Sequence, residues 1–535
     1  MEAIIIKNKY FLFTIISILT VVLAFFNTTV FHSISIGVLV FIFYFTINGI
    51  LAGFVLGKLA RIEKFLQSLF GFLFLIYFVA FLGAIFIVLL KFDVNLIPSI
   101  LIFISIVIPI IIYFLQKQVP FNTVERPINE NSYNTNFRAN KYLLIILPFL
   151  FFLAYIFLFQ GRTDKYILSP WETVPTSYLG VIFLIFFIIG VLVFRLYKYK
   201  LVLLIIVILS TLIHSYLPIV YEAGYGGDKW RHLGTEKQII EGRTISPSFL
   251  DKPIAMSKIG SLNVPSVLIA GNKTSYANQW SATVILSYIL QIDIFWIDLL
   301  LVFLLWSIFM PLIFFQIGLF AIPGNKLFAL LMALVTNIFY SLQVIGAITI
   351  PVSFGNLFLV FSLVFLIYLF KKKSKPLLFL VGLLSIMMYF NYFNALLMWL
   401  FVIFLYFSSR ILVSLKFYKY SIIRYIFTLL FIFLITFLVV HLDLFYSKVF
   451  NLGTEIDEAT LSFRNIKSAV GSWLSSLLGL SFFKMSDGQI AGSYFIGISL
   501  PKFIQFYPFN SKFILILTNY LILFFSFIGF YTLRK

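Results

Sequence analysis

The sequence predicts an all-α polytopic membrane protein of about 14 transmembrane helices, with both termini in the cytoplasm. Hydrophobic residues make up 62% of the 535 residues, whereas charged residues make up only 11%. Apolar runs long enough to cross a bilayer recur along the whole chain, and a soluble core could not bury so many of them. These two observations define the class before any motif is considered.

The spans can be assigned in order from the apolar runs. The first run, from Tyr10 to about Phe26, follows Lys7 and Lys9 and lacks a small-residue cleavage site, so we expect a retained helix. The centres of the spans are expected near residues 18, 46, 78, 106, 151, 185, 209, 306, 335, 361, 383, 402, 431 and 522. Alternate connections between them are rich in lysine and arginine: KLARIEK (58–64), the segment 116–141, RLYKYK (195–200), KKKSK (371–375), RILVSLKFYKYSIIR (410–424) and the terminal RK.

The distribution of basic residues predicts the topology. The opposite short connections contain only Lys91, Arg162 and Lys165, so the basic connections are expected in the cytoplasm. The formal net charge of +20 is then mainly a topology signal, with some contact to anionic membrane lipids. Nucleic-acid binding is not expected, because no soluble domain carries a basic patch with interleaved aromatic residues. The absence of cysteine excludes disulfides, thiol catalysis and zinc–thiolate sites.

Two domains are expected. Residues 1–200 form an N-terminal transmembrane extension of about six helices, and residues 201–535 form a second module. That module carries two long segments, 218–291 and 443–511, which the topology places outside the plasma membrane.

The first external segment contains the most informative stretch, GYGGDKWRHLGTEKQIIEGR (224–243). Its apolar residues recur with helical spacing up to Gly242, which predicts a short amphipathic helix at the membrane surface. Asp228 and His232 lie four residues apart and share one face of this helix. An alternative is that Asp228 only caps the helix N-terminus. The apolar residues that give the stretch its helical spacing are Trp230, Leu233, Ile239 and Ile240.

A second amphipathic stretch, from Tyr276 to Leu290, leads from the first external segment into the next span. Between the two stretches, residues 244–275 are rich in Gly, Ser, Asn and Pro, and we expect them to move when a substrate enters.

This arrangement resembles the GT-C superfamily of membrane glycosyltransferases, of the dolichyl-phosphate-mannose mannosyltransferase type. The resemblance rests on an external Gly-Gly-Asp-x-x-x-His followed by a helix, a second surface helix and a run of short-looped spans, and it covers about residues 201–535. Two features depart from the family pattern. About seven spans precede the acidic loop instead of one, and the next external loop, QVIGAITIPVSF (343–354), contains no carboxylate.

The resemblance implies an inverting hexosyltransferase with its active site on the extracytoplasmic side. The donor would be a polyprenyl-phosphate sugar, and the acceptor a glycan, lipid or protein. It implies Asp228 as the general base that deprotonates the acceptor hydroxyl. No metal ligand is assigned, because the second acidic motif that would support a divalent cation is missing. The side chains expected to bind the donor phosphate are His232, Arg231, Lys229, Arg243 and Arg464.

Two other interpretations remain open. An enzyme of the O-antigen polymerase or ligase type would depend on Arg231 and Arg464 more than on Asp228. A lipid-linked oligosaccharide flippase or transporter would need polar residues along its path. After Asp298, ionisable residues hardly occur at mid-membrane depth, which counts against a coupled transporter.

Overall fold

The computed structural model describes residues 2–118, 137–165, 167, 170–196, 198–225, 227–259, 262–269, 271–338, 340–372, 374–392, 395–396, 398–400 and 402–404. The chain divides into two compact units. The first contains residues 1–135, 196–214 and 227–424, and the second contains residues 136–195, 215–226 and 425–535. Arg464, the external segment 443–511 and the predicted spans centred near residues 431 and 522 lie outside the described residues.

The described chain is mostly helical, as a membrane-spanning chain requires, because backbone groups in a bilayer must be satisfied within the segment. The helices of the first unit are α1 (Glu2–Phe26), η1 (Asn27–Phe31), α2 (Ile34–Ala60), α3 (Lys64–Leu89), η2 (Val94–Leu96), α4 (Ile97–Gln118), α7 (Tyr199–His214), α9 (Gly227–Ile240), η4 (Ser266–Ile269), α10 (Gly271–Leu290), α11 (Ile294–Ala321), α12 (Lys326–Val335), α13 (Tyr340–Ala347), α14 (Pro351–Lys371) and α15 (Lys375–Tyr389).

Eight helices of the described chain are long and apolar enough to cross a membrane, and each contains one of the predicted centres. A polytopic helical membrane protein is therefore confirmed, whereas the count of about 14 spans and the orientation of the chain stay predictions. The centres near residues 209 and 383 fall in the shorter apolar helices α7 and α15. The run near residue 335 is broken, because α12 ends at Val335 and a new helix, α13, begins at Tyr340.

Glycines allow α2 and α3 to pack backbone against backbone. A Cβ on Gly71 would collide with the carbonyl oxygen of Gly49 and with the backbone of Gly53. A Cβ on Gly53 would in turn collide with the carbonyl of Gln67. Small residues replace hydrophobic collapse as the means of helix association in a bilayer, so this contact fixes the α2–α3 pair.

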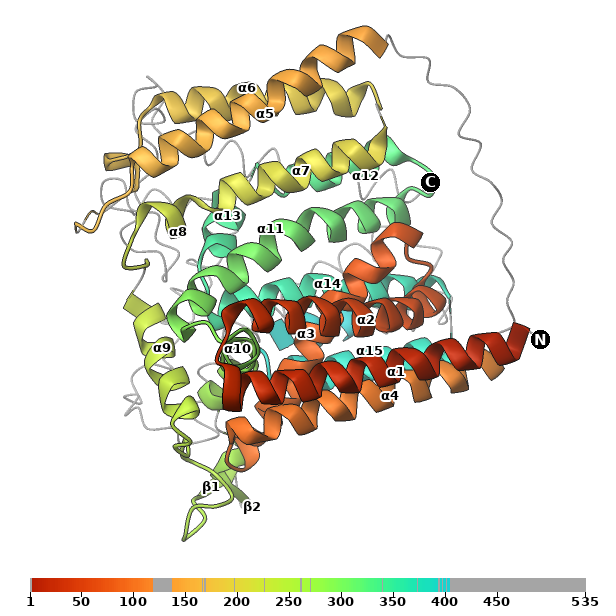
Figure 1. The fold of residues 1–535 in the computed structure, drawn as a ribbon, viewed down its shortest axis with the longest axis vertical. Coiled ribbons are helices and arrows are strands. Elements are labelled where there is room, and N and C mark those ends of the chain that lie inside the picture. The colour runs from red at the N-terminus through yellow and green to blue at the C-terminus, as the bar shows by residue number, and fades with distance from the viewer. Residues whose placement is uncertain are drawn as a thin grey trace, which may run out of the picture. The chain divides into compact units, whose positions relative to one another are not determined.

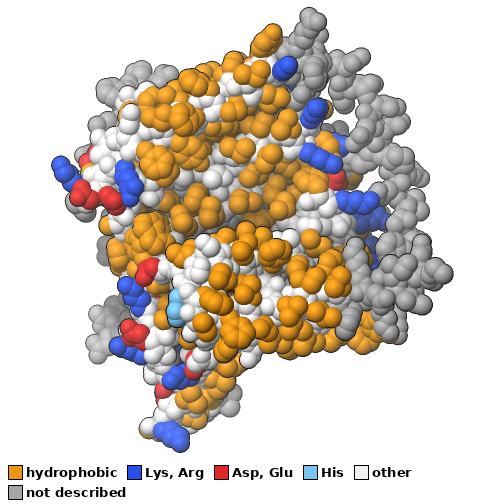
Figure 2. Space-filling view, in the orientation of Figure 1, with side chains coloured by type: hydrophobic (Ala, Val, Ile, Leu, Met, Phe, Trp, Pro, Cys, Tyr) orange, Lys and Arg blue, Asp and Glu red, His pale blue; other side chains and the backbone are white. Residues whose placement is uncertain are grey.

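Two helices of the first unit run across the spans instead of along them. Figure 1 shows α10 nearly end-on and α9 lying across the ends of the spans. Together with the hairpin of β1 (Met256–Ile259) and β2 (Leu262–Pro265), they belong to the predicted external segment, residues 218–291. Figure 2 shows charged side chains gathered around α9 and hydrophobic side chains over α1 and α2. The surface helix expected from residue 228 onward is therefore present.

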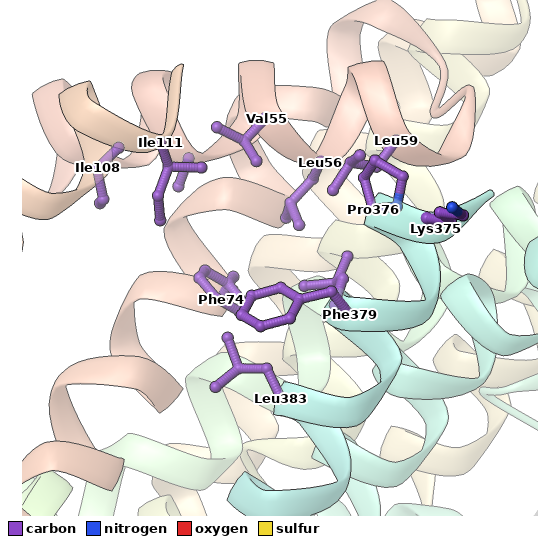
Figure 3. Close-up of a pocket in the computed structure, with 12 residues that line it drawn as sticks. Val55, Leu56, Leu59, Phe74, Ile108, Ile111, Lys375, Pro376, Phe379 and Leu383 are labelled. Carbon is purple, nitrogen blue, oxygen red and sulfur yellow. The ribbon is translucent and has the colours of Figure 1, made fainter. Parts of the chain in front are cut away.

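A pocket of about 320 Å³ lies among α2, α3, α4 and α15. Its walls are apolar and include Leu56, Phe74, Ile108 and Phe379, with Lys375 near one end (Figure 3). Phe379 is largely exposed, as expected of a side chain that faces lipid in a membrane-spanning region.

The second unit contains α5 (Phe137–Gln160), η3 (Pro170–Glu172), α6 (Ser177–Phe194) and α8 (Tyr216–Val220). The segment after α5 pairs with the end of α8, since the Thr163 amide donates to the carbonyl of Val220 at 2.9 Å and the Glu222 amide donates to the carbonyl of Thr163 at 3.2 Å. An ion pair between Arg162 and Glu222, 2.9 Å long, strengthens this contact. The predicted boundary at residue 200 stays a prediction. The first unit nevertheless joins the N-terminal spans directly to the external segment, because α10 packs against α2 and α3.

Candidate functional site

Helix α9 begins at Gly227 and carries the candidate residues on its first two turns. Asp228 lies inside the first turn of the helix, so its position differs from that of a capping residue. The helix ends at Ile240, close to the predicted stop at Gly242, which has a φ of 69°. There the amides of Gly242 and Arg243 donate to the carbonyls of Ile239 and Gln238, a pattern that satisfies the last turn.

Asp228 is a partly exposed carboxylate held by two neighbours on its own helix. Its Oδ1 accepts from Nη2 of Arg231 at 2.6 Å, and its Oδ2 lies 3.4 Å from Nε2 of His232. The Asp228 side chain keeps 35% of its surface exposed, whereas His232 is buried. The predicted pairing of Asp228 with His232 on one face is therefore present, and the carboxylate remains open to a reactant.

Helix α10 sets the tautomer of His232. It contains the stretch predicted as a second surface helix, Tyr276–Leu290, but most of its side chains are buried, so that prediction is wrong. Nε1 of Trp280 on α10 donates to Nδ1 of His232 at 3.1 Å, so a neutral imidazole carries its proton on Nε2, facing Asp228. The ring of Tyr276 meets the imidazole edge-on at 5.0 Å. Burial lowers the pKa of His232, although the charge of Asp228 opposes that shift. The imidazole is thus held neutral and oriented toward the carboxylate.

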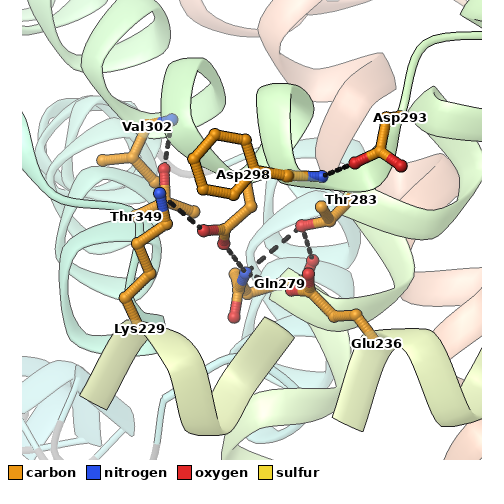
Figure 4. Close-up of polar contacts among 9 residues, drawn as sticks. Lys229, Glu236, Gln279, Thr283, Asp293, Asp298, Val302 and Thr349 are labelled. Atoms are coloured by element: carbon orange, nitrogen blue, oxygen red, sulfur yellow. Dashed lines mark hydrogen bonds and ion pairs between the residues drawn. The ribbon is translucent and has the colours of Figure 1, made fainter. Parts of the chain in front are cut away.

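Directly after Asp228, Lys229 points into the protein and starts a buried polar cluster. Its Nζ lies 3.5 Å from Oδ2 of Asp298 on α11 and 4.6 Å from the centre of the Phe295 ring. Asp298 is fully buried although it lies one turn inside a membrane-spanning helix. Figure 4 shows this ion pair beside the polar side chains of α10. The buried polar cluster is defined as Lys229, Glu236, Gln279, Thr283 and Asp298.

Glu236 joins the buried polar cluster two turns further along α9. Nε2 of Gln279 donates to Oε1 of Glu236 at 2.6 Å and lies 3.5 Å from Oδ1 of Asp298. Thr283 is hydrogen-bonded to both Gln279 and Glu236. The three consecutive helices α9, α10 and α11 therefore meet through one polar network (Figure 4).

With Lys229 charged, the charges of the buried polar cluster balance when one of its two carboxyl groups is protonated. Burial raises the pKa of Glu236 well above its usual value, and the neighbouring charge of Asp298 raises it further. Burial lowers the pKa of Lys229, while Asp298 opposes that shift. A charged Lys229, a charged Asp298 and a neutral Glu236 leave the cluster without net charge, which keeps the free-energy cost of burying it low.

The chain between α9 and α10 is anchored by one lysine. Nζ of Lys273, which is buried, donates to the carbonyls of Val88 at 3.1 Å, Pro247 at 2.8 Å and Ile245. Burial lowers the pKa of Lys273 to about 8, with Asp251 opposing the shift. Lys273 therefore ties the predicted mobile segment, residues 244–275, to the end of α3.

The other predicted site residues are separated by the fold. Arg243 is exposed and pairs with Glu241 at 2.8 Å instead of with Asp228. Lys229, expected at the surface with Arg231, is withdrawn into the buried polar cluster. Arg464 is outside the described residues. Within the described part of the chain, no group of three or more His, Asp or Glu side chains is placed to hold a metal ion.

Sequence reasoning missed the buried partners of α9. In the sequence, Glu236 is one of several charged residues on a polar helix, and Gln279 and Thr283 belong to no recognisable motif. Asp298 was the one signal in the sequence. It lies one turn inside a 28-residue apolar helix, where an ionisable side chain costs free energy and therefore indicates a functional or paired residue.

Comparison with known proteins adds no family: no protein-family model, no curated protein and no solved structure matches this chain.

Proposed function

We propose that this protein is an integral membrane glycosyltransferase that transfers a sugar from a polyprenyl-phosphate donor to an extracytoplasmic acceptor at the plasma membrane. The observation that carries the proposal is the partly exposed carboxylate of Asp228 on a helix across the ends of the spans, oriented by Arg231 and by the Trp280–His232 pair. A donor of this class keeps its isoprenoid chain in the bilayer and its phosphate at the level of α9.

The arrangement supplies the groups that an inverting transfer needs. Asp228 takes the proton of the acceptor hydroxyl while the acceptor oxygen bonds to the anomeric carbon. The bond from that carbon to the phosphate oxygen breaks, and its electron pair leaves with the polyprenyl phosphate. The sugar therefore arrives with inverted configuration, and the proton remains on Asp228 until water removes it.

Arg231 is suited to the departing phosphate. Its guanidinium has five N–H donors, and the contact with Asp228 leaves others for a phosphate oxygen. Arg243 follows the C-terminal end of α9, whereas Asp228 lies in its first turn, and its exposed side chain pairs with Glu241. Lys229 is engaged with Asp298 and contributes no surface charge in this conformation.

The test is sugar transfer in membranes supplied with radiolabelled polyprenyl-phosphate hexoses. Asp228→Asn should lower transfer by about 10²- to 10⁴-fold, as expected for loss of a general base. Glu241→Gln, the same kind of change at an exposed acid near the end of α9, is the control and should keep full activity. Unchanged transfer by Asp228→Asn with loss in Arg231→Gln would favour the arginine-dependent polymerase type, and wild-type protein that transfers from no donor would refute the proposal.

A second candidate, transport of a lipid-linked sugar, is supported by the buried polar cluster. Buried carboxylates beside a lysine are what proton-coupled transporters use as relays, and Lys229, Glu236 and Asp298 provide them. Proton-driven movement of a fluorescent lipid-linked sugar across vesicles would then be lost in Glu236→Gln and retained in Asp228→Asn. Transfer in the radiolabel assay with no such movement would exclude this candidate.

A further inference from the structure

At the end of the spans opposite α9, the first unit contains a pocket with aromatic walls and a basic rim. Its volume is about 400 Å³, within the range of small-ligand sites. The basic pocket is defined by the lining residues Arg61, Glu63, Tyr199, Phe315, Lys326 and Tyr368.

Five helix ends place the basic pocket at the level of lipid headgroups. It lies where α2 ends and α3 begins, where α7 begins, and where α11 passes into α12. The other end of α3 lies at the candidate site, since Lys273 binds the carbonyl of Val88 there. The basic pocket is thus separated from Asp228 by the full length of α3, and the distribution of basic residues predicts that it faces the cytoplasm.

The floor of the basic pocket is aromatic and held in place by polar contacts. The rings of Tyr199 and Phe315 stack with their centres 6.2 Å apart and their planes 7° apart. The hydroxyl of Tyr199 donates to Oε1 of Glu63 at 3.2 Å. The backbone amide of Glu63 donates to Oε1 of Gln316 at 3.0 Å. Such a floor is flat, apolar and rigid.

Cations outnumber acids around this floor. Nζ of Lys326 lies 4.1 Å from the centre of the Tyr199 ring, and Nζ of Lys200 lies 5.8 Å from the same ring. Arg61, the exposed residue that ends α2, adds a third positive charge. Glu63 is the one acid among the lining residues. The basic pocket therefore selects an anion that also has an apolar part.

We propose that the basic pocket binds the phosphodiester headgroup of an anionic phospholipid. Arg61 and Lys326 would pair with the phosphate, and the aromatic floor would contact the glycerol and the first methylenes of the acyl chains. Basic pockets between spans at the cytoplasmic face are typical sites for such headgroups, and the negative potential of that leaflet favours the ligand. This site is independent of the proposed sugar transfer at the opposite end of the spans.

The experiment measures binding of phosphatidylglycerol to the delipidated full-length protein in detergent, with phosphatidylcholine as the neutral lipid. Lys326→Gln and Arg61→Asn should each weaken phosphatidylglycerol binding by about fivefold. Asparagine is chosen because Arg61 has a φ of 44°, a conformation that asparagine tolerates. Lys372→Gln is the matched control, since Lys372 is an exposed cation at the end of α14 and is not among the residues that line the basic pocket.

A variant that should bind phosphatidylglycerol more tightly tests the same site without depending on a loss of binding. Glu63→Gln removes the negative charge but keeps an oxygen that can accept from Tyr199, so phosphatidylglycerol should bind about fivefold more tightly. A misfolded variant cannot produce this result.

Three outcomes would overturn the proposal. They are equal binding of the two lipids, an equal loss in Lys372→Gln, and an unchanged affinity in Glu63→Gln. Competition by glycerol phosphate alone, at the concentration at which the lipid binds, would assign the basic pocket to a free phosphate ester instead of a lipid.

Discussion

Replacing Glu236 with glutamine should stabilise the protein, and increasingly so as the pH rises. Glutamine has the shape of a protonated glutamate, and its carbonyl oxygen can still accept from Nε2 of Gln279, which now binds Oε1 of Glu236 at 2.6 Å. In the wild type, folding must keep the buried Glu236 protonated, because its pKa is raised by burial and by Asp298. Glutamine removes that requirement.

The magnitude follows from the ordinary pKa of a glutamate, about 4.3. Each pH unit above it costs about 1.4 kcal/mol for a carboxyl group that must stay protonated in the folded state. The wild type thus has the full contribution of Glu236 below pH 4.3 and loses it as the pH rises toward the raised folded pKa. The stabilisation by Glu236→Gln should therefore be absent below about pH 4.3 and grow with each pH unit above it until the pH reaches the raised folded pKa.

The assay is chemical or thermal unfolding in detergent between pH 5 and pH 8. Glu241→Gln is the control, because Glu241 lies at the end of the same helix but is exposed and pairs with Arg243. Its effect should stay within about 0.5 kcal/mol at every pH. If Glu236→Gln is less stable than the wild type at pH 8, Glu236 is ionised and paired with Lys229, and the reasoning is refuted.

Two further changes test the packing and the site. Gly71→Ala should destabilise the protein by about 2 kcal/mol or more, because the new methyl group meets the backbone of Gly49. Gly382→Ala is the control: its methyl group meets nothing within 4 Å, so the thermal midpoint should not fall. Trp280→Phe removes the N–H donor that keeps the proton of His232 on Nε2, so sugar transfer should fall roughly tenfold with little change in KM. Unchanged transfer would show that the tautomer of His232 does not matter.

The spans could be predicted from the sequence because their signal is local. A run of about 20 apolar residues is a helix in a bilayer whatever it packs against, so each of the eight long helices contains one of the predicted centres. The end of α9 was equally local, since Gly242 adopts a positive φ that most other residues avoid. The break between α12 and α13 could not be predicted in this way, because no glycine or proline marks it.

The face that α9 buries could not be predicted from periodicity. Leu233 and Ile239 are buried as expected, but Trp230 and Ile240 are exposed. Lys229, His232 and Glu236 are buried instead. Ionisable residues become the inner face of a helix only when distant partners neutralise them, and a hydrophobic pattern contains no information about those partners. The partners here belong to α10 and α11, more than 40 residues further along the chain.

The buried polar cluster also explains why Asp228 remains open to the surface. Asp228 and Lys229 are consecutive on α9, so their side chains point about 100° apart around the helix. The ion pair of Lys229 with Asp298 and the bond of Glu236 with Gln279 hold one face of α9 against the protein, two turns apart. Rotating α9 by one residue would break both contacts and leave Asp298 buried without a cation, at a cost of several kcal/mol. The buried charges therefore fix the rotation of α9, and that rotation leaves the Asp228 carboxylate partly exposed beside Arg231 and His232.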